Sequence, residues 1–528
     1  MRFSSIVAGT AIVGGSLVSA LDRLEIKGTK FFYKNGTEFF MKGIAYQQEY
    51  AAAGTGSTNK DGSYKDPLAD VTACKRDIPL MQELRTNTIR VYAIDPTKDH
   101  KECMKMLDDA GIYVVADLGE PKTSINRDSP TWDEALYTRY TGVIDELAKY
   151  PNVIGFFSGN EVTNNRSNTV ASAFVKAATR DMKAYIKSKG YANLGVGYAT
   201  NDDAEIRDDM TDYFNCNSRD ESIDFWGYNI YSWCGDSSFT KAGYDKVVRD
   251  FQNFSVPVFF AEYGCNEVQP RKFTEVGAIY GSQMTDVLSG GIVYMYFQEA
   301  NNYGLVEVQN GQAKKKDDFK YLADQMKKID PKRATKDSYQ PSNGGLRTCP
   351  NTQVWKLSKT LPPTPNKELC GCMTKSLACV ANDNISDKDI AKLFGTVCGL
   401  SKTACAGIAT DAIKGAYGAY SMCNPKEQLS FAMNAYFQEQ SGKGNGQNAC
   451  DFGGNARKQS PVSPSGNCDS LIKQAGKDGT GSVTSSPNAS GSKSAASPMT
   501  IPSFNFNILN IGAYLFCAII AGAGTVLL

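Results

Sequence analysis

Asn152-Val153-Ile154-Gly155-Phe156-Phe157-Ser158-Gly159-Asn160-Glu161 is an apolar, strand-like run that ends in an amide and a carboxylate. Farther along the chain a second such run, Val256-Pro257-Val258-Phe259-Phe260-Ala261, leads directly into Glu262. The carboxyl end of a buried parallel strand is where β/α barrels keep their catalytic groups. A pair of carboxylates serves glycoside cleavage, one as acid and one as nucleophile or base. A single Asn-Glu after a strand is more often a helix cap, so the pairing of the two motifs favours catalysis.

The region around these motifs alternates between short β-branched or aromatic runs and longer amphipathic stretches. This alternation predicts β/α units around a parallel sheet. Segments 133–149 and 169–187 carry apolar residues at helical spacing. No Gly-x-Gly-x-x-Gly follows the first run, which disfavours an open, doubly wound sheet. We therefore predict an α/β fold, a (β/α)8 TIM-type barrel. Its candidate strands are 39–47, 87–94, 112–118, 153–159, 194–200, 223–231, 256–261 and 291–298.

Charge and histidine content exclude several classes of function. The chain has 57 Lys and Arg against 56 Asp and Glu, so it lacks the excess positive charge that favours nucleic-acid binding. Its one histidine, His100, stands in a polar segment, and we expect a solvated surface residue. Catalytic triads and zinc hydrolases need histidines beside the reacting groups. Carboxylate chemistry remains, and we expect no metal and no cofactor.

The predicted barrel places further side chains around the two glutamates. Glu161 ends the fourth predicted strand and Glu262 the seventh, and parallel strands bring both to one mouth. A ring of polar and aromatic residues at strand ends predicts a sugar-binding cleft, although any single tyrosine is as often a core residue with a bonded hydroxyl. The other strand-end residues are Gln47, Tyr92, Asp117, Asp202, Tyr231 and Tyr294.

Both ends of the chain carry targeting signals. Residues 1–20 predict a secretory signal peptide, with a basic start, an apolar centre and Val18-Ser19-Ala20 as cleavage site. At the other end, small residues precede an apolar tail without charges, the pattern of a glycolipid-anchor signal. We expect a Ser/Gly-rich linker at 469–494, attachment at Ser494 and removal of 495–528. A transmembrane helix is the alternative, but no basic residues follow the apolar run.

The cysteines fit an exported protein. There are fifteen, which favours disulfides in an oxidising compartment. Cys370-Gly371-Cys372 permits a metal site, but a small, mainly helical, disulfide-stapled module over 370–468 is the better interpretation, with its connectivity left open. The Pro-rich stretch 351–369 joins this module to the barrel at 21–350. The module's cysteines are Cys370, Cys372, Cys379, Cys398, Cys405, Cys423, Cys450 and Cys468.

Other side chains give surface expectations. Tyr417, Tyr420 and Tyr436 form a candidate glucan platform, with core packing as the alternative. Asn-X-Ser/Thr acceptors become glycan sites in an exported chain where they are exposed. They stand at Asn35, Asn165, Asn253, Asn384 and Asn488.

Several motifs together resemble glycoside hydrolase family 72, the fungal glycolipid-anchored β-1,3-glucanosyltransferases. The resemblance covers about residues 21–350, and the block Gly159-Asn160-Glu161-Val162-Thr163-Asn164 is highly specific. Residues 370–468 are similar to the carbohydrate-binding family 43 module found in one branch of that family. The other motifs are Arg90-Val91-Tyr92-Ala93-Ile94, Thr123-Ser124-Ile125-Asn126-Arg127, Ala261-Glu262-Tyr263-Gly264-Cys265-Asn266 and Gly291-Ile292-Val293-Tyr294-Met295-Tyr296-Phe297.

The resemblance implies a retaining transfer between β-1,3-glucan chains by a protein that is anchored at the membrane. We expect this protein to be a monomer. It gives Glu161 the acid/base role and Glu262 the nucleophile role. Tyr231 is expected near Glu262, where its hydroxyl would keep that carboxylate ionised. The implied disulfides are Cys74–Cys103, Cys216–Cys349 and Cys234–Cys265. The resemblance and the strand-end positions together give the candidate substrate contacts, which are Gln47, Tyr92, Asp117, Gly119, Ser124, Asn126, Arg127, Asn160, Asp202, Arg207, Tyr231 and Tyr294.

Two other functions stay open at this point. A secreted endo-β-1,3-glucanase would use the same carboxylates with water as acceptor. A non-catalytic wall lectin would bind glucan without cleaving it. The presence of Glu161, Glu262 and Asn160 together argues against the lectin, because binding alone does not need all three.

Overall fold

The structure, a computed structural model, describes residues 20–48 and 63–484. Most of the predicted signal peptide, Asn488, the anchor site Ser494 and the tail 495–528 lie outside the described residues. The chain divides into two compact units. The first comprises the described residues up to Pro130 and Thr138–Lys356, and the second Thr131–Tyr137 and the residues from Leu357 onward.

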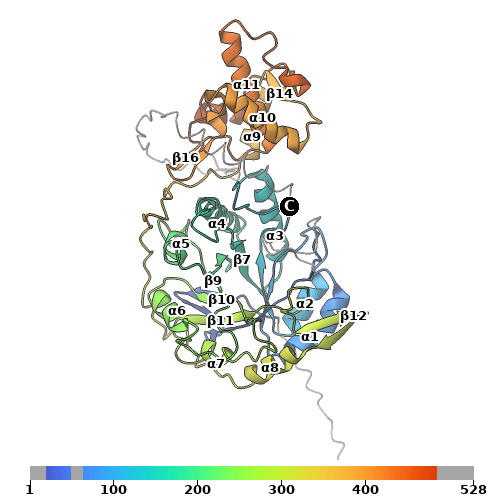
Figure 1. Cartoon of the computed structure of the whole chain (residues 1–528), viewed down its shortest axis with the longest axis vertical. Coiled ribbons are helices and arrows are strands. Elements are labelled where there is room, and N and C mark those ends of the chain that lie inside the picture. The colour runs from blue at the N-terminus through green and yellow to red at the C-terminus, as the bar shows by residue number, and fades with distance from the viewer. Residues whose placement is uncertain (1–19, 49–62, 485–528) are drawn as a thin grey trace, which may run out of the picture. The chain divides into compact units, whose positions relative to one another are not determined.

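The first unit is built on a closed barrel of parallel strands (Figure 1). All eight predicted strands are present in the predicted order. The largest displacement is at β11, because its start, Leu288-Ser289-Gly290-Gly291, lacks the β-branched residues that mark a strand. A side chain at Gly290 would meet the Met41 carbonyl at 2.2 Å, so the close strand contact requires glycine there. The strands are β4 (Met41–Ala45), β5 (Thr88–Val91), β6 (Tyr113–Asp117), β7 (Val153–Asn160), β8 (Gly195–Thr200), β9 (Trp226–Asn229), β10 (Val258–Tyr263) and β11 (Leu288–Val293).

Helices follow the barrel strands along the chain. The predicted helical segments 133–149 and 169–187 correspond to α3 and α4, whose apolar residues recur at helical spacing. In α4 nearly every residue except the polar stripe near its carboxyl end is buried. The helices are α1 (Val71–Glu83), α2 (Lys101–Asp109), α3 (Glu134–Leu147), α4 (Ala171–Ser188), α5 (Arg207–Phe214), α6 (Tyr244–Phe251), α7 (Val276–Ile279) and α8 (Asp317–Met326).

Aromatic side chains fill the amino-terminal half of the barrel. A small antiparallel sheet, β1 (Glu25–Lys27), β2 (Lys30–Phe32) and β3 (Glu38–Phe39), closes this end. Phe31 of β2 packs against Phe225 and Phe259, with ring centroids 6.3 and 6.2 Å away. Phe157 meets Phe225 edge to face at 5.3 Å. The barrel is therefore a packed core at this end, and only the opposite end has room for chemistry.

Disulfides and a short hairpin complete the first unit. The hairpin pairs β12 (Val306–Gln309) with β13 (Gln312–Lys315). Trp355 is fully buried against Tyr213, so the first unit extends into the stretch 351–369 that we assigned to the join. The disulfides are the same three pairs that the resemblance implies, namely Cys74–Cys103, Cys216–Cys349 and Cys234–Cys265.

The second unit is mainly helical and disulfide-rich, as predicted. Its helices are α9 (Lys367–Ser376), α10 (Asp387–Leu400), α11 (Pro425–Gly442) and α12 (Asn467–Ala475), with the 3-10 turns η1 (Thr403–Ile408) and η2 (Phe452–Gly454). Its strand pairs are β14 (Cys379–Ala381) with β17 (Ala456–Lys458), and β15 (Thr410–Asp411) with β16 (Ala416–Tyr417).

All eight cysteines of the module pair with one another. Since Cys370 and Cys372 are both oxidised, neither offers a thiolate to a metal. Tyr420 is buried against Phe431, with ring centroids 4.8 Å apart, so it is a core residue and not part of a glucan platform. Tyr417 and Tyr436 are partly exposed. The disulfides are Cys370–Cys423, Cys372–Cys468, Cys379–Cys450 and Cys398–Cys405.

Surface features agree in part with the sequence expectations. Of the glycan acceptors, Asn35, Asn253 and Asn384 are exposed, whereas Asn165 is half-buried and bonded to its neighbours. Within the described ranges, we find no helix that combines the length and apolar character needed to span a membrane.

The expectation that His100 is solvated is wrong. Its side chain is 0% exposed and lies between two carboxylates, with Nε2 2.9 Å from Asp66 Oδ2 and Nδ1 3.1 Å from Glu146 Oε1. Burial disfavours the imidazolium, but the hydrogen bonds and charges of both acids outweigh it, so the pKa of His100 is raised. Both ring nitrogens can donate only in the charged form. The polar sequence around His100 gave no sign of its burial, because its partners, Asp66 and Glu146, come from distant segments.

We predict that His100→Gln destabilises the protein mainly at acid pH. Since the folded pKa lies above the unfolded value of about 6.5, the stabilisation is complete below that value and is lost as pH rises through the folded pKa. Urea denaturation should show a loss of about 2–4 kcal/mol near pH 5 that shrinks with increasing pH. Lys149→Gln, which removes an exposed cation from Glu146, is the control and should cost under about 1 kcal/mol. A His100→Gln effect that stays constant or grows with pH would contradict the assignment.

Candidate active site

The two glutamates stand at the carboxyl ends of β7 and β10. Glu262 lies inside β10, and Glu161 directly follows Asn160, the last residue of β7. Glu161 has a φ of +49°, a conformation that residues other than glycine rarely adopt. Its backbone is held there on both sides: its N–H donates to the Ala199 carbonyl at 2.8 Å, and its carbonyl accepts from Arg127 Nη2 at 2.6 Å. Such strain is typical of functional sites.

A buried arginine connects the strand ends. Arg90 of β5 is 0% exposed, and each of its five N–H groups has an acceptor. Nε and Nη2 bind both oxygens of Asp117 at 3.1 and 3.0 Å, and Nη1 binds Glu262 Oε1 at 3.2 Å. Nη2 also donates to Asn160 Oδ1 at 3.0 Å, and Nη1 to the Ala261 carbonyl. One cation on β5 thus fixes groups from three other strands, β6, β7 and β10.

Glu262 receives donors on both of its oxygens. Tyr231 donates to Oε2 at 2.7 Å, while Tyr92 and Arg90 donate to Oε1 at 2.8 and 3.2 Å. Burial raises the pKa of Glu262 to about 7; Arg90 opposes the rise, Glu161 adds to it, and the two tyrosines lower it. Tyr231 therefore favours the ionised form, as expected, but burial outweighs it. Near neutral pH the free protein holds Glu262 partly protonated.

Two asparagines connect Arg90 to Glu161. Asn160 accepts from Arg90 and from Asn229, whose Nδ2 lies 3.1 Å from Asn160 Oδ1. The same Nδ2 donates to Glu161 Oε1 at 2.9 Å. Asn160 Oδ1 takes two donors, and its Nδ2 has no hydrogen-bond partner among the described residues, so Nδ2 is the group that can donate to a substrate hydroxyl.

Tyrosines gather beside Glu262. The Tyr294 ring lies 6.3 Å from both Tyr92 and Tyr231 and 5.2 Å from Tyr303, all edge to face. Tyr294 and Tyr231 are partly exposed, so they offer some ring surface of the kind that sugars stack on. Tyr303, in the segment after β11, was not predicted, because it stands well beyond the strand end.

Two of the predicted substrate contacts, Gln47 and Asp117, form hydrogen bonds with other groups of the protein. Gln47 is buried, and its Oε1 accepts from the backbone N–H groups of Tyr92 and Ala93. Its Nε2 donates to the Lys65 carbonyl. Asp117 binds Arg90 through both oxygens. Both residues therefore hold neighbours of the site in place.

The remaining predicted contacts lie in two loops. In the first, Ser124 and Asn126 are exposed, and Gly119 packs so tightly that a side chain there would lie 3.1 Å from Ser124. In the second, after β8, Arg207 forms an ion pair with Asp202 at 3.0 Å, and Tyr228 donates to the same carboxylate. A cavity of about 290 Å³ is lined by Arg207 and Tyr228 among other residues.

Sequence reasoning missed Arg90 and Asn229. Arg90 stands inside β5, and Asn229, the last residue of β9, falls inside the predicted strand 223–231, so a search for polar residues at predicted strand ends passed over both. The signal was nonetheless present, because a charged or amide residue within a buried barrel strand needs a polar partner in the interior.

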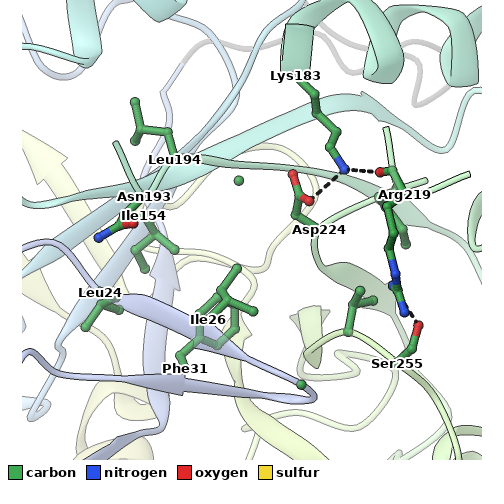
Figure 2. A pocket seen from close by; sticks show the side chains of 14 residues that line it. Leu24, Ile26, Phe31, Ile154, Lys183, Asn193, Leu194, Arg219, Asp224 and Ser255 are labelled. Atoms are coloured by element: carbon green, nitrogen blue, oxygen red, sulfur yellow. Dashed lines mark hydrogen bonds and ion pairs between the residues drawn. The ribbon is translucent and has the colours of Figure 1, made fainter. Parts of the chain in front are cut away.

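A larger cavity, of about 410 Å³, lies at the other end of the barrel (Figure 2). Its lining includes Ile154 and Leu194, at the amino ends of β7 and β8. The Lys183 ammonium there binds Asp224 at 2.7 Å and the Arg219 carbonyl, so its charge is neutralised within the protein. The cavity is therefore distinct from the glutamate site, since barrel chemistry belongs at the carboxyl ends.

A (β/α)8 barrel with two hydrogen-bonded glutamates at its mouth defines the class of carboxylate-dependent glycoside-processing enzymes. The profile of glycoside hydrolase family 72, described as glucanosyltransferase, matches residues 14–330, and the chain belongs to this family. A second profile, the X8 domain, matches residues 377–457.

Relatives agree with this assignment. The chain is 65% identical to a 1,3-beta-glucanosyltransferase of Arthroderma benhamiae, with 100% of both chains covered. It is 43% identical to 1,3-beta-glucanosyltransferase gas1 of Schizosaccharomyces pombe, over 94% of this chain and 90% of that one. A solved structure of a Saccharomyces cerevisiae Gas2p mutant with laminaritetraose and laminaripentaose superposes with a TM-score of 0.75 at 38% identity, covering 85% of this chain and 98% of that chain.

We predict that Tyr231→Phe moves the acid limb of the kcat/KM profile to higher pH. The hydroxyl donates to the ionised form of Glu262, so its loss raises the pKa of that carboxyl, by about one unit for a hydrogen bond to a charge. Tyr303→Phe is the matched control, because Tyr303 lies in the same aromatic cluster without a hydrogen bond to Glu262 among the described residues. An acid limb that does not move in Tyr231→Phe, or that moves equally in both variants, would refute the assignment.

Proposed function

We propose that this protein is a retaining β-1,3-glucanosyltransferase. It cleaves an internal β-1,3 bond of one glucan and joins the new reducing end to the non-reducing end of another. The observation that carries the proposal is the pair Glu161 and Glu262, linked through Arg90 and two asparagines at one barrel mouth. The glucanosyltransferase relatives and the laminari-oligosaccharides bound to Gas2p support the substrate class.

The first half of the reaction forms a glycosyl-enzyme. The Glu262 carboxylate attacks the anomeric carbon while Glu161 gives its proton to the glycosidic oxygen, so that the reducing-side fragment leaves as an alcohol. Tyr92, Tyr231 and Arg90 hold the nucleophile. The amide nitrogen of Asn160 is the donor available to the sugar's 2-hydroxyl, a contact that strengthens in the transition state.

The second half transfers the sugar. Glu161, now ionised, takes the proton from the 3-hydroxyl of an acceptor glucan as that oxygen attacks the anomeric carbon and releases Glu262. Transfer prevails over hydrolysis when a bound acceptor excludes water from this position. We assign donor binding to Tyr92, Tyr294 and the 119–127 loop, and acceptor binding to Asp202 and Arg207. Gln47 and Asp117 support the donor side through their contacts with Tyr92 and Arg90.

The proposed location is the outer face of the fungal plasma membrane and the adjoining wall. A signal peptide at 1–20 would export the chain, and a glycolipid at Ser494 would replace residues 495–528. The second unit would bind glucan, and the chain would act as a monomer. Release by a phosphatidylinositol-specific phospholipase would support the anchor, and full retention after that treatment would favour a membrane-spanning tail.

Product analysis on a short laminari-oligosaccharide with a reduced end tests the proposal. We predict products both longer and shorter than the substrate, because transfer lengthens one chain as it shortens another. Glu262→Gln, the isosteric control, should lower the rate by more than about 1,000-fold. Only shorter products would identify a hydrolase. An unchanged substrate with the wild-type protein would identify a glucan-binding protein without catalysis.

A further inference from the structure

Asn229 is the least expected member of the site. It is the last residue of β9, its side chain is 2% exposed, and its Nδ2 donates to both Asn160 Oδ1 and Glu161 Oε1. Its own Oδ1 is buried and has no hydrogen-bond partner among the described residues. An unpaired buried carbonyl is unfavourable. The amide is therefore held in this orientation by its two donated bonds.

Arg90, Asn160, Asn229 and Glu161 are linked by a chain of hydrogen bonds. The direction of each of these bonds follows from Arg90. A guanidinium has donors only, so Asn160 must turn its oxygen toward Arg90. That oxygen also faces Asn229, which must therefore present its NH2 group. The same NH2 group reaches Glu161 Oε1, which must accept. The buried Arg90 cation at one end of this hydrogen-bond chain thus determines that Glu161 Oε1 accepts at the other end.

We propose that Asn229 is a positioning residue that determines which oxygen of Glu161 carries the catalytic proton. An oxygen that accepts from Asn229 is the carbonyl oxygen of the protonated acid, so the proton is placed on Oε2. Among the described residues Oε2 has no hydrogen-bond partner, which leaves its proton for the glycosidic oxygen. The inference rests on the acid/base role proposed for Glu161.

Two substitutions separate positioning from general support of the fold. Asn229→Asp presents acceptors only, so the Glu161 proton is drawn to Oε1, between the two carboxyl groups. Asn229→Ala removes the donor and lets the proton occupy either oxygen. We compare kcat/KM on β-1,3-glucan with kcat/KM on a dinitrophenyl laminari-oligosaccharide, whose leaving group departs without a proton.

The expected result is a selective loss on the natural bond. Asn229→Asp should lower kcat/KM on glucan by about 100-fold and Asn229→Ala by about 10-fold, within the range of general acid catalysis. Both should lose less than about threefold on the activated donor. Asn152→Asp is the control, because Asn152 is a fully buried asparagine at the other end of β7 whose Nδ2 binds only backbone carbonyls. Its effects on the two donors should be equal.

Glu161→Gln, measured alongside, separates this inference from the proposed function. If Glu161→Gln also shows no selective loss on glucan, the acid assignment itself fails. If Glu161→Gln is selective but both Asn229 variants lose equally on the two donors, or lose nothing, the positioning role is overturned and the acid assignment stands. Should Asn229→Asp not be secreted, the Asn229→Ala comparison decides alone.

Discussion

The buried guanidinium of Arg90 is the interaction on which the rest of the site depends. Burying a charged group costs free energy unless the group is paired and fully hydrogen-bonded. Arg90 meets both conditions through Asp117, Glu262 and its neutral acceptors. Those bonds hold the ends of β5, β6, β7 and β10 in one arrangement. The pKa of Arg90 is raised, because the acids around it outweigh the cost of burial. It therefore stays charged at neutral pH.

Two kinds of constraint act on the two glutamates. Glu262 is held by charge and by phenol donors, which oppose the effect of burial on its ionisation. Glu161 is held by its backbone, through Arg127 and Ala199, and by the Asn229 amide at one carboxyl oxygen. The donors around Glu262 thus favour its ionised form against the effect of burial, whereas Glu161 keeps one carboxyl oxygen without a hydrogen-bond partner among the described residues. This asymmetry is what a reaction with distinct nucleophile and acid roles requires.

Much of the fold was predictable, because the spacing of apolar residues and the lengths of the segments indicate alternating strands and helices. The eight strands follow from their apolar runs, and β11 was displaced only where Gly290 and Gly291 replace branched residues. The site was predictable where a polar residue follows a strand. Arg90, Asn229 and His100 were missed or wrong because each depends on partners far away in sequence. Pairing in the cysteine module could not be derived from spacing, since the fold alone decides which sulfurs meet.

Trapping the glycosyl-enzyme tests the central claim most directly. An activated 2-deoxy-2-fluoro laminari-oligosaccharide should form the covalent adduct and release it slowly, because fluorine destabilises the transition state of both steps. Peptide mapping of the labelled protein should place one sugar on Glu262. A label on Glu161 or on another residue, or turnover of this donor without any adduct, would contradict the account.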